Sequence, residues 1–131
     1  MLQLLAQRMN KKIKVGLIGS QFISHIHALS LKRCPDVEVF AVGSPTPGNA
    51  QKFAANHAIP HHFTDYKQIL AMPEVDLIVV GTPNDTHCAI TLDAAAAGKH
   101  VVMEKPLCLN LADAVAALQF PALVTPLRLN R

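Results

Sequence analysis

The chain has 131 residues, of which half are hydrophobic and 16% are charged, and its formal net charge at pH 7 is +3. This length fits one domain with enough apolar material for a core, and the composition argues against disorder through most of the chain. The basic excess lies mainly near the two ends and forms no helical stripe interleaved with aromatic residues, so nucleic acid is not expected as a partner.

Two further features bear on location and metal binding. The three cysteines, Cys34, Cys88 and Cys108, are far apart and form neither a CxxC pair nor a Cys–His spacing suited to zinc. We interpret them as free thiols in a reducing compartment, and we predict no metal site. No apolar run approaches the roughly 18 residues of a membrane span, and the first ten residues are too short for a signal peptide. These observations predict a cytoplasmic protein that does not engage a membrane.

Strands and helices alternate along the chain. Short apolar runs predict strands at 13–18, 37–42, 61–63, 75–80 and 99–103. Helical spacing predicts helices at 22–32, 49–57, 65–70, 86–97 and 111–119. Thr46, Thr64 and Asn110 are the expected N-caps of the second, third and last helices, and Pro47 can serve as the first residue of the second. This alternation predicts an α/β fold with a Rossmann-like, doubly wound parallel sheet. We expect this domain to span residues 11–119, between an extension over 1–10 and an irregular tail over 120–131.

The turn after the first strand keeps only part of a dinucleotide-binding fingerprint. Where three glycines are expected, the sequence has Gly19, Gln21 and Ser24. The backbone amides of Gln21, Phe22 and Ile23 at the helix start could still bind a phosphate. A tight turn without a ligand is an equally good interpretation of this segment.

The end of the second strand lacks the acidic residue that binds the ribose in many NAD enzymes. Ser44 and Thr46 offer hydroxyl groups that suit either a ribose or a 2′-phosphate, and no arginine is adjacent. NAD and NADP therefore both remain candidates, with NADP slightly favoured. The alternative is that both residues serve only the turn and the helix cap.

Two later loops carry candidate site residues. Thr82, Pro83, Asn84 and His87 follow the fourth predicted strand, where open α/β sheets contact nucleotides, although a lone histidine is more often a packed or solvated ring. The fifth predicted strand ends in Glu104-Lys105-Pro106, which places Lys105 just beyond a carboxyl end. A solvated Glu–Lys pair is the alternative for that last motif. The remaining histidines are predicted to be ordinary surface or packing residues.

The sequence from about residue 12 to 117 resembles the glucose–fructose oxidoreductase / inositol dehydrogenase family (Gfo/Idh/MocA). The resemblance rests on three segments, which are Val15 to Gly19 with His27 downstream, Val75 to Val80 followed by Thr82-Pro83-Asn84 and His87, and Ala97 to Val101 leading into Glu104-Lys105-Pro106. The last two segments are far more specific than the incomplete glycine turn.

The resemblance implies the NAD(P)-binding domain of an oxidoreductase that acts on a sugar, a polyol or a related CH–OH substrate by hydride transfer. Lys105 would be the catalytic lysine near the nicotinamide, with Glu104 and Pro106 shaping the site. Thr82, Pro83, Asn84 and His87 would line the cofactor pocket, and Ser44 would lie beside the adenosine ribose.

The sequence departs from the family in two respects. Gln21 stands where the second glycine is usual, and the 26 residues after Lys105 contain no histidine and no second α/β domain with its substrate pocket. A truncated or frameshifted product would explain the tail. We therefore expect a single domain that is inactive alone. Alternatives are a non-catalytic nucleotide-binding module and a partner-binding module, including a homo-oligomer formed through the surface left by the missing domain.

Overall fold

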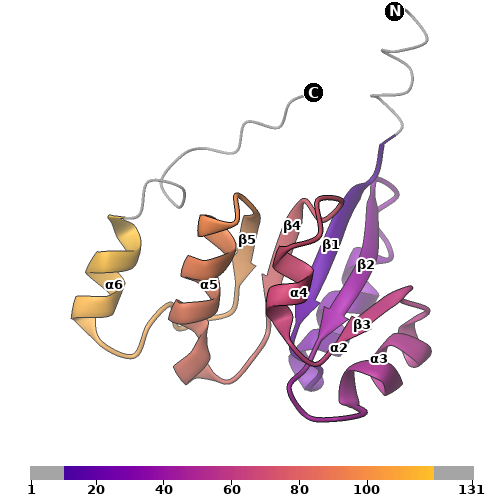
Figure 1. The fold of residues 1–131 in the computed structure, drawn as a ribbon, viewed down its shortest axis with the longest axis horizontal. Helices are drawn as coiled ribbons and strands as arrows, with labels where there is room; N and C mark the ends of the chain where they lie inside the picture. The colour runs from indigo at the N-terminus through magenta and orange to yellow at the C-terminus, as the bar shows by residue number, and fades with distance from the viewer. Residues whose placement is uncertain (1–10, 120–131) are drawn as a thin grey trace, which may run out of the picture.

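Five parallel strands form the sheet of the structure, a computed structural model that describes residues 11–119. The strands are β1 (Ile13–Ile18), β2 (Val37–Gly43), β3 (His61–Phe63), β4 (Leu77–Val80) and β5 (His100–Met103). Their order is β3-β2-β1-β4-β5, so β1 is central and the chain adds strands first on one side and then on the other (Figure 1). This confirms the predicted Rossmann-like, doubly wound sheet. The predicted extension and tail lie outside the described residues.

Helices cover both faces of the sheet. They are α2 (Phe22–Leu31), α3 (Asn49–His57), α4 (Tyr66–Leu70), a 3₁₀ turn η1 (Asn84–Thr86), α5 (His87–Ala96) and α6 (Leu111–Leu118). Successive residues of β1 enter different cores because side chains alternate along a strand. Leu17 packs in one core with Phe53 of α3, and Ile18 packs in the other with Ile69 of α4 and Ile90 of α5. Helix α6 packs against α5 and lies at the end of the molecule farthest from α3 (Figure 1).

The start of α3 differs from the prediction. Thr46 was expected to cap this helix and Pro47 to open it, but the helix begins at Asn49. Gly48 precedes it with φ of +82°, a left-handed conformation that interrupts any helix begun at Pro47. The Asn49 amide donates to the carbonyl of Thr46 at 3.2 Å, which closes a turn ahead of the helix. The capping prediction for Thr46 and Pro47 is therefore wrong.

Two other helix starts are shifted. The carboxylate of Asp65, rather than the hydroxyl of Thr64, caps α4 by accepting a hydrogen bond from the Lys67 amide at 2.9 Å. The predicted 86–97 helix begins as a separate 3₁₀ turn, and the regular α-helix starts at His87. These shifts of one or two residues are common at helix ends, where several polar side chains compete for the same amides.

The hydrogen-bond ladder of the sheet continues past the ends of the strands. Four backbone bonds of this kind join neighbouring loops, and they are Gly19 N–H to Gly43 O at 2.8 Å, Ser44 N–H to Phe63 O at 3.0 Å, Gly81 N–H to Ile18 O at 2.8 Å and Glu104 N–H to Val80 O at 3.1 Å. Because all strands are parallel, these loops lie along one edge. Each predicted site residue lies in one of these loops or at the helix start that follows it.

The approach of two of these loops requires glycine at position 19. Gly19 has φ of +113°, and a Cβ built there would lie 2.3 Å from the carbonyl oxygen of Gly81. Gly48 also has a positive φ, of +82°, but a Cβ there would meet nothing within 4 Å. A substitution at Gly48 therefore introduces only the strain of a positive φ, whereas one at Gly19 also introduces a clash with Gly81.

We expect Gly19→Ala to lower the free energy of unfolding by about 3–5 kcal/mol, because it adds a backbone clash to the strain of a positive φ. Gly48→Ala should cost only about 1–2 kcal/mol, since it introduces the strain alone. Urea denaturation of both variants measures the difference. Equal losses would mean that the contact between Gly19 and Gly81 relaxes without cost.

Candidate active site

The turn after β1 presents unpaired amides at the start of α2. Gln21 is extended and exposed, and its side chain makes no capping hydrogen bond. Its carbonyl accepts from the Ser24 amide at 3.0 Å, which begins the helix. In the part of the chain that the structure describes, no acceptor lies against the amides of Phe22 and Ile23. These N–H groups and the helix dipole fit an anionic group such as a phosphate.

The loop after β2 lies against this turn. Ser44 is 5% exposed, and its hydroxyl accepts a hydrogen bond from the Ser20 hydroxyl at 2.9 Å. Its amide is held by the carbonyl of Phe63 at the end of β3. Ser44 thus lies between the turn after β1 and the edge strand β3, with a hydroxyl that already has one partner. The sequence offered no signal for the role of Ser20, because only folding brings the two loops together.

The loop after β4 is a tight polar turn. The Thr86 hydroxyl lies 2.7 Å from both the Thr82 hydroxyl and the Pro83 carbonyl oxygen, to either of which it can donate. Pro83 and Asn84 are exposed at the same edge as Gly19, whereas Thr82 is partly buried. The turn therefore offers a proline face and an amide side chain to any molecule lying along this edge.

His87 joins the loop after β4 to the loop after β5. Its ring is 1% exposed, with Nε2 2.8 Å from the carbonyl oxygen of Thr82 and Nδ1 2.9 Å from that of Pro106. Either neutral tautomer donates to one of these carbonyls, and the imidazolium donates to both. Both nitrogens therefore face the protein backbone. Its assignment as a cofactor contact stays a prediction, while its geometry makes it a positioning residue for both loops.

The Glu104-Lys105-Pro106 segment places its acid and its base in different surroundings. Glu104 Oε1 lies 2.8 Å from Nε2 of His27 on α2, with the two side chains 26% and 25% exposed. Lys105 is exposed, and the Lys105–Pro106 peptide bond is cis. Between residues 11 and 119, the Glu104 carboxylate has His27 as its only basic partner, so the Lys105 ammonium is not paired with its neighbouring carboxylate. It remains available to a reacting group.

Two histidine contacts were not predicted from the sequence. His27 was predicted to be an ordinary residue, and it holds Glu104 across 77 residues of chain. His25 and His57 join α2 to α3, with Nδ1 and Nε2 2.6 Å apart beside the ring of Phe53. Burial first, and then the charges of His25 and Lys32, lower the pKa of His57. The presence of His27 in the family-like segment was the one available signal for the first contact.

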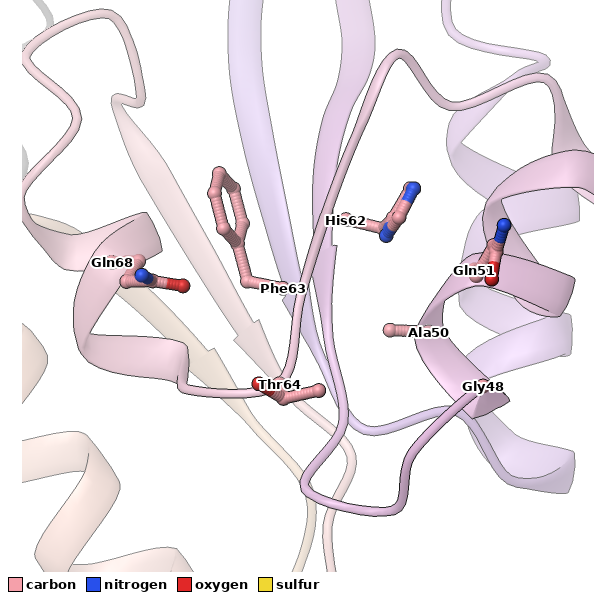
Figure 2. A pocket seen from close by; sticks show the side chains of 7 residues that line it. All are labelled: Gly48, Ala50, Gln51, His62, Phe63, Thr64 and Gln68. Atoms are coloured by element: carbon pink, nitrogen blue, oxygen red, sulfur yellow. The ribbon is translucent and has the colours of Figure 1, made fainter.

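A surface cavity of about 280 Å³ lies at the β3 edge of the sheet (Figure 2). It is lined by Gly48, Ala50, Gln51, His62, Phe63, Thr64 and Gln68. Figure 2 shows His62 on the side of α3 and Phe63 on the side of α4, so the cavity straddles the end of an edge strand. None of the predicted site residues lines it. It includes Gly48, at the end of the loop that begins at the predicted site residue Ser44.

Residues 11–119 contain neither a metal-binding cluster nor a membrane-spanning helix. No cluster of three or more histidine, cysteine or acidic side chains there has a geometry that could hold a metal ion. Among the helices of the same residues, none is long and apolar enough to cross a membrane.

Comparison with known proteins identifies the domain. Residues 13–121 match an oxidoreductase family with an NAD-binding Rossmann fold, GFO_IDH_MocA. The chain belongs to this family. This confirms the resemblance seen in the sequence, and it agrees with the loops that the fold brings together at one edge. The matched segment includes the turn after β1 and the Glu104-Lys105-Pro106 motif.

Individual GFO_IDH_MocA proteins resemble the chain over a limited part of their length. Myo-inositol 2-dehydrogenase of Thermotoga maritima is 32% identical over 77% of this chain, which corresponds to 30% of that protein. The oxidoreductase YrbE of Bacillus subtilis is 29% identical over 94% of this chain and 37% of its own length. A levoglucosan dehydrogenase in complex with NADH has a TM-score of 0.80 at 26% identity, over 84% of this chain and 32% of the other. The chain thus spans about a third of these relatives.

We expect His87→Ala to lower the free energy of unfolding by about 2–4 kcal/mol, because it leaves a cavity and removes the donor to a backbone carbonyl. The exposed His100 on β5 provides the control, and His100→Ala should change stability by no more than about 0.5 kcal/mol. Urea denaturation compares the two variants. A loss at position 87 no larger than that at position 100 would contradict the positioning role.

Proposed function

We propose that this chain is the cofactor-binding part of an oxidoreductase that transfers a hydride between NAD(P) and a CH–OH group of a sugar, a polyol or a related substrate. The observation that carries this proposal is the arrangement of loops along the carboxyl edge of the sheet. The unpaired amides of α2, the buried Ser44 and the unpaired Lys105 follow β1, β2 and β5 in turn. Open α/β sheets bind nucleotides at this edge.

The residues present fit a dinucleotide lying along this edge. The amides of Phe22 and Ile23 would bind the pyrophosphate, with Gly19 allowing the tight turn and Gln21 directing its side chain to solvent. Ser44 would contact the adenosine ribose through its hydroxyl. Thr82, Pro83 and Asn84 would line the path toward the nicotinamide. NAD and NADP both fit this arrangement, since neither an acid nor an arginine stands beside Ser44.

Lys105 is the residue that we assign to the chemistry. The bound nicotinamide would accept or supply the hydride. The Lys105 ammonium, exposed beyond β5, would hold the substrate oxygen and help its proton leave. His27 fixes the neighbouring Glu104 carboxylate through its contact with Oε1. His87 positions the Lys105 loop through its contact with the Pro106 carbonyl.

A second candidate function is a binding module without turnover of its own. The observation in its favour is that the chain spans about a third of the relatives it matches. Phe22 and Val102 are also 78% and 47% exposed, which leaves apolar surface for another polypeptide. In that case the domain would bind a nucleotide or a partner, including a second copy of itself, without reducing a substrate.

Calorimetric titration with NADH and with NADPH tests cofactor binding, and we expect a Kd on the order of micromolar for at least one of them. Gln21→Glu should weaken binding about tenfold or more, because it places a carboxylate beside the pyrophosphate. The same change should leave the free energy of unfolding unaltered or raise it by about 0.3–1 kcal/mol, since an acid suits a helix N-terminus.

Gln119→Glu, at the end of α6 and away from the site, is the matched control and should leave both affinities unchanged. If Gln21→Glu weakens cofactor binding without lowering the free energy of unfolding, the pyrophosphate contact lies at the turn that carries position 21. The absence of heat with either cofactor, from a chain that circular dichroism finds folded, would contradict the proposal.

We expect the chain alone to give no turnover of NAD or NADP with myo-inositol or another polyol. The 26 residues after Lys105 contain no histidine that could act with it in acid–base chemistry. The absorbance of the reduced nicotinamide measures turnover, with the myo-inositol 2-dehydrogenase of Thermotoga maritima as the positive control. Reduction of cofactor well above background by this chain would overturn the expectation.

A further inference from the structure

Two histidine rings join α2 to α3 on one face of the sheet. His25 lies in the first turn of α2, and His57 is the last residue of α3. The Nδ1 atom of His25 is 2.6 Å from the Nε2 atom of His57, a separation at which one nitrogen donates a hydrogen bond and the other accepts it. The two residues are 32 positions apart in the chain, so no local pattern in the sequence indicates that they meet.

This histidine pair has apolar surroundings. His57 is 6% exposed, and the centroid of the Phe53 ring lies 4.5 Å from the centroid of each histidine ring. Phe53 itself is buried in the core that α3 shares with β1 and β2. Water therefore has little access to the hydrogen bond, and a charge placed on His57 costs more free energy than it would in solvent.

The charges that act on His57 are basic. Burial first, and then His25 and Lys32 of α2, lower the pKa of His57 below its ordinary value of 6.5. The end of a helix favours a positive charge, but here that effect is outweighed. On β3, His62 lines the cavity beside the start of α3, at the opposite end of that helix from His57.

No acidic group of the described residues compensates a charge on the pair. Glu38 of β2 alternates with Val37 and Val39, which pack with the core on the α3 side, so the Glu38 side chain points to the other face of the sheet. Lys14 of β1 also lies on that other face, with its ammonium 3.9 Å from the centroid of the Phe40 ring. Within residues 11–119, no carboxylate forms an ion pair with either ring of the histidine pair.

We propose that the contact between His25 and His57 holds α2 against α3 near neutral pH and opens in acid, when both facing nitrogens carry a proton. The gap of 2.6 Å accommodates one proton, so a pair that is neutral or carries a single positive charge keeps its hydrogen bond. A further proton leaves two N–H groups pointing at each other on two like charges, and the rings must then separate. This inference does not depend on cofactor binding, because neither ring belongs to the proposed cofactor contacts.

The direction of the pH effect follows from the lowered pKa of His57. The unfolded chain takes up a proton at this residue near pH 6.5, whereas the folded chain does so at a lower pH. The unfolded state therefore binds more protons as the pH falls below 6.5, and the free energy of unfolding falls with it. Because His25 shares the first turn of α2 with the amides of Phe22 and Ile23, opening also disturbs the turn after β1. Only the importance of that turn for a cofactor rests on the proposed function.

Thermal unfolding of the full chain without a ligand, followed by circular dichroism at about pH 7.5 and about pH 5, tests the proposal. His57→Gln keeps a side chain that can hydrogen-bond but cannot take up a proton, and His62→Gln, on the exposed side of β3, is the matched control. We expect the midpoint of the parent chain to fall by roughly 5 °C or more between the two pH values. His57→Gln should lose at least about half of this fall, and His62→Gln should retain it.

Proton NMR of the histidine rings provides a second measurement, on the folded chain. The pKa of His57 should lie below 6.5 in the parent chain and should rise in His25→Gln, because the neighbouring positive charge is removed. If glutamine at position 57 prevents folding, this comparison decides alone. A parent midpoint that does not fall in acid, a His57→Gln chain that keeps more than about half of the fall, or a pKa of His57 that is unchanged in His25→Gln would each overturn the proposal.

Discussion

The backbone hydrogen bonds that continue the parallel ladder beyond the strand ends hold the candidate site together. Gly81 N–H donates to Ile18 O, and Glu104 N–H donates to Val80 O, so the loops after β1, β4 and β5 are tied edge to edge. A parallel sheet places all carboxyl ends on one side, and these bonds extend that order into the loops. The unpaired amides at the start of α2 and the Lys105 ammonium are consequently aligned by the backbone, before any side chain contributes.

Glycine at position 19 makes this alignment sterically feasible where the loops after β1 and β4 meet. The oxygen of Gly81 occupies the space that a Cβ at position 19 would need, and Gly19 has a backbone conformation that other residues rarely adopt. The glycine retained from the fingerprint thus serves the approach of two loops as well as a tight turn. This explains why position 21 can carry a glutamine, whose backbone is extended and whose side chain lies in solvent.

Histidines connect the loops where the ladder ends. His87 contacts the carbonyls of Thr82 and Pro106, and His27 contacts Glu104 from a helix on the other side of the sheet. The buried His87 thereby ties the start of α5 to the loop that carries Lys105. A substitution of His87 would therefore reach the proposed catalytic lysine through the backbone of the adjacent Pro106.

The sequence by itself determined the fold class, the number of strands and their approximate limits, because apolar runs of strand length and helical spacing alternate clearly. It also identified the segments that carry the family resemblance, since Gly19, the Thr82 loop and the Lys105 motif are local patterns. Helix starts near Thr46 and Thr64 were misplaced, because competing caps differ by little free energy and Gly48 adopts a conformation that no pattern specified.

Only the tertiary structure decided which distant residues meet. The pairs His27 with Glu104 and Ser20 with Ser44 are separated by 77 and 24 residues of chain. Such contacts depend on strand order and helix packing, which place residues side by side without leaving a periodic trace in the sequence. The burial of His87 is of the same kind, because the carbonyls that enclose its ring come from two separate loops.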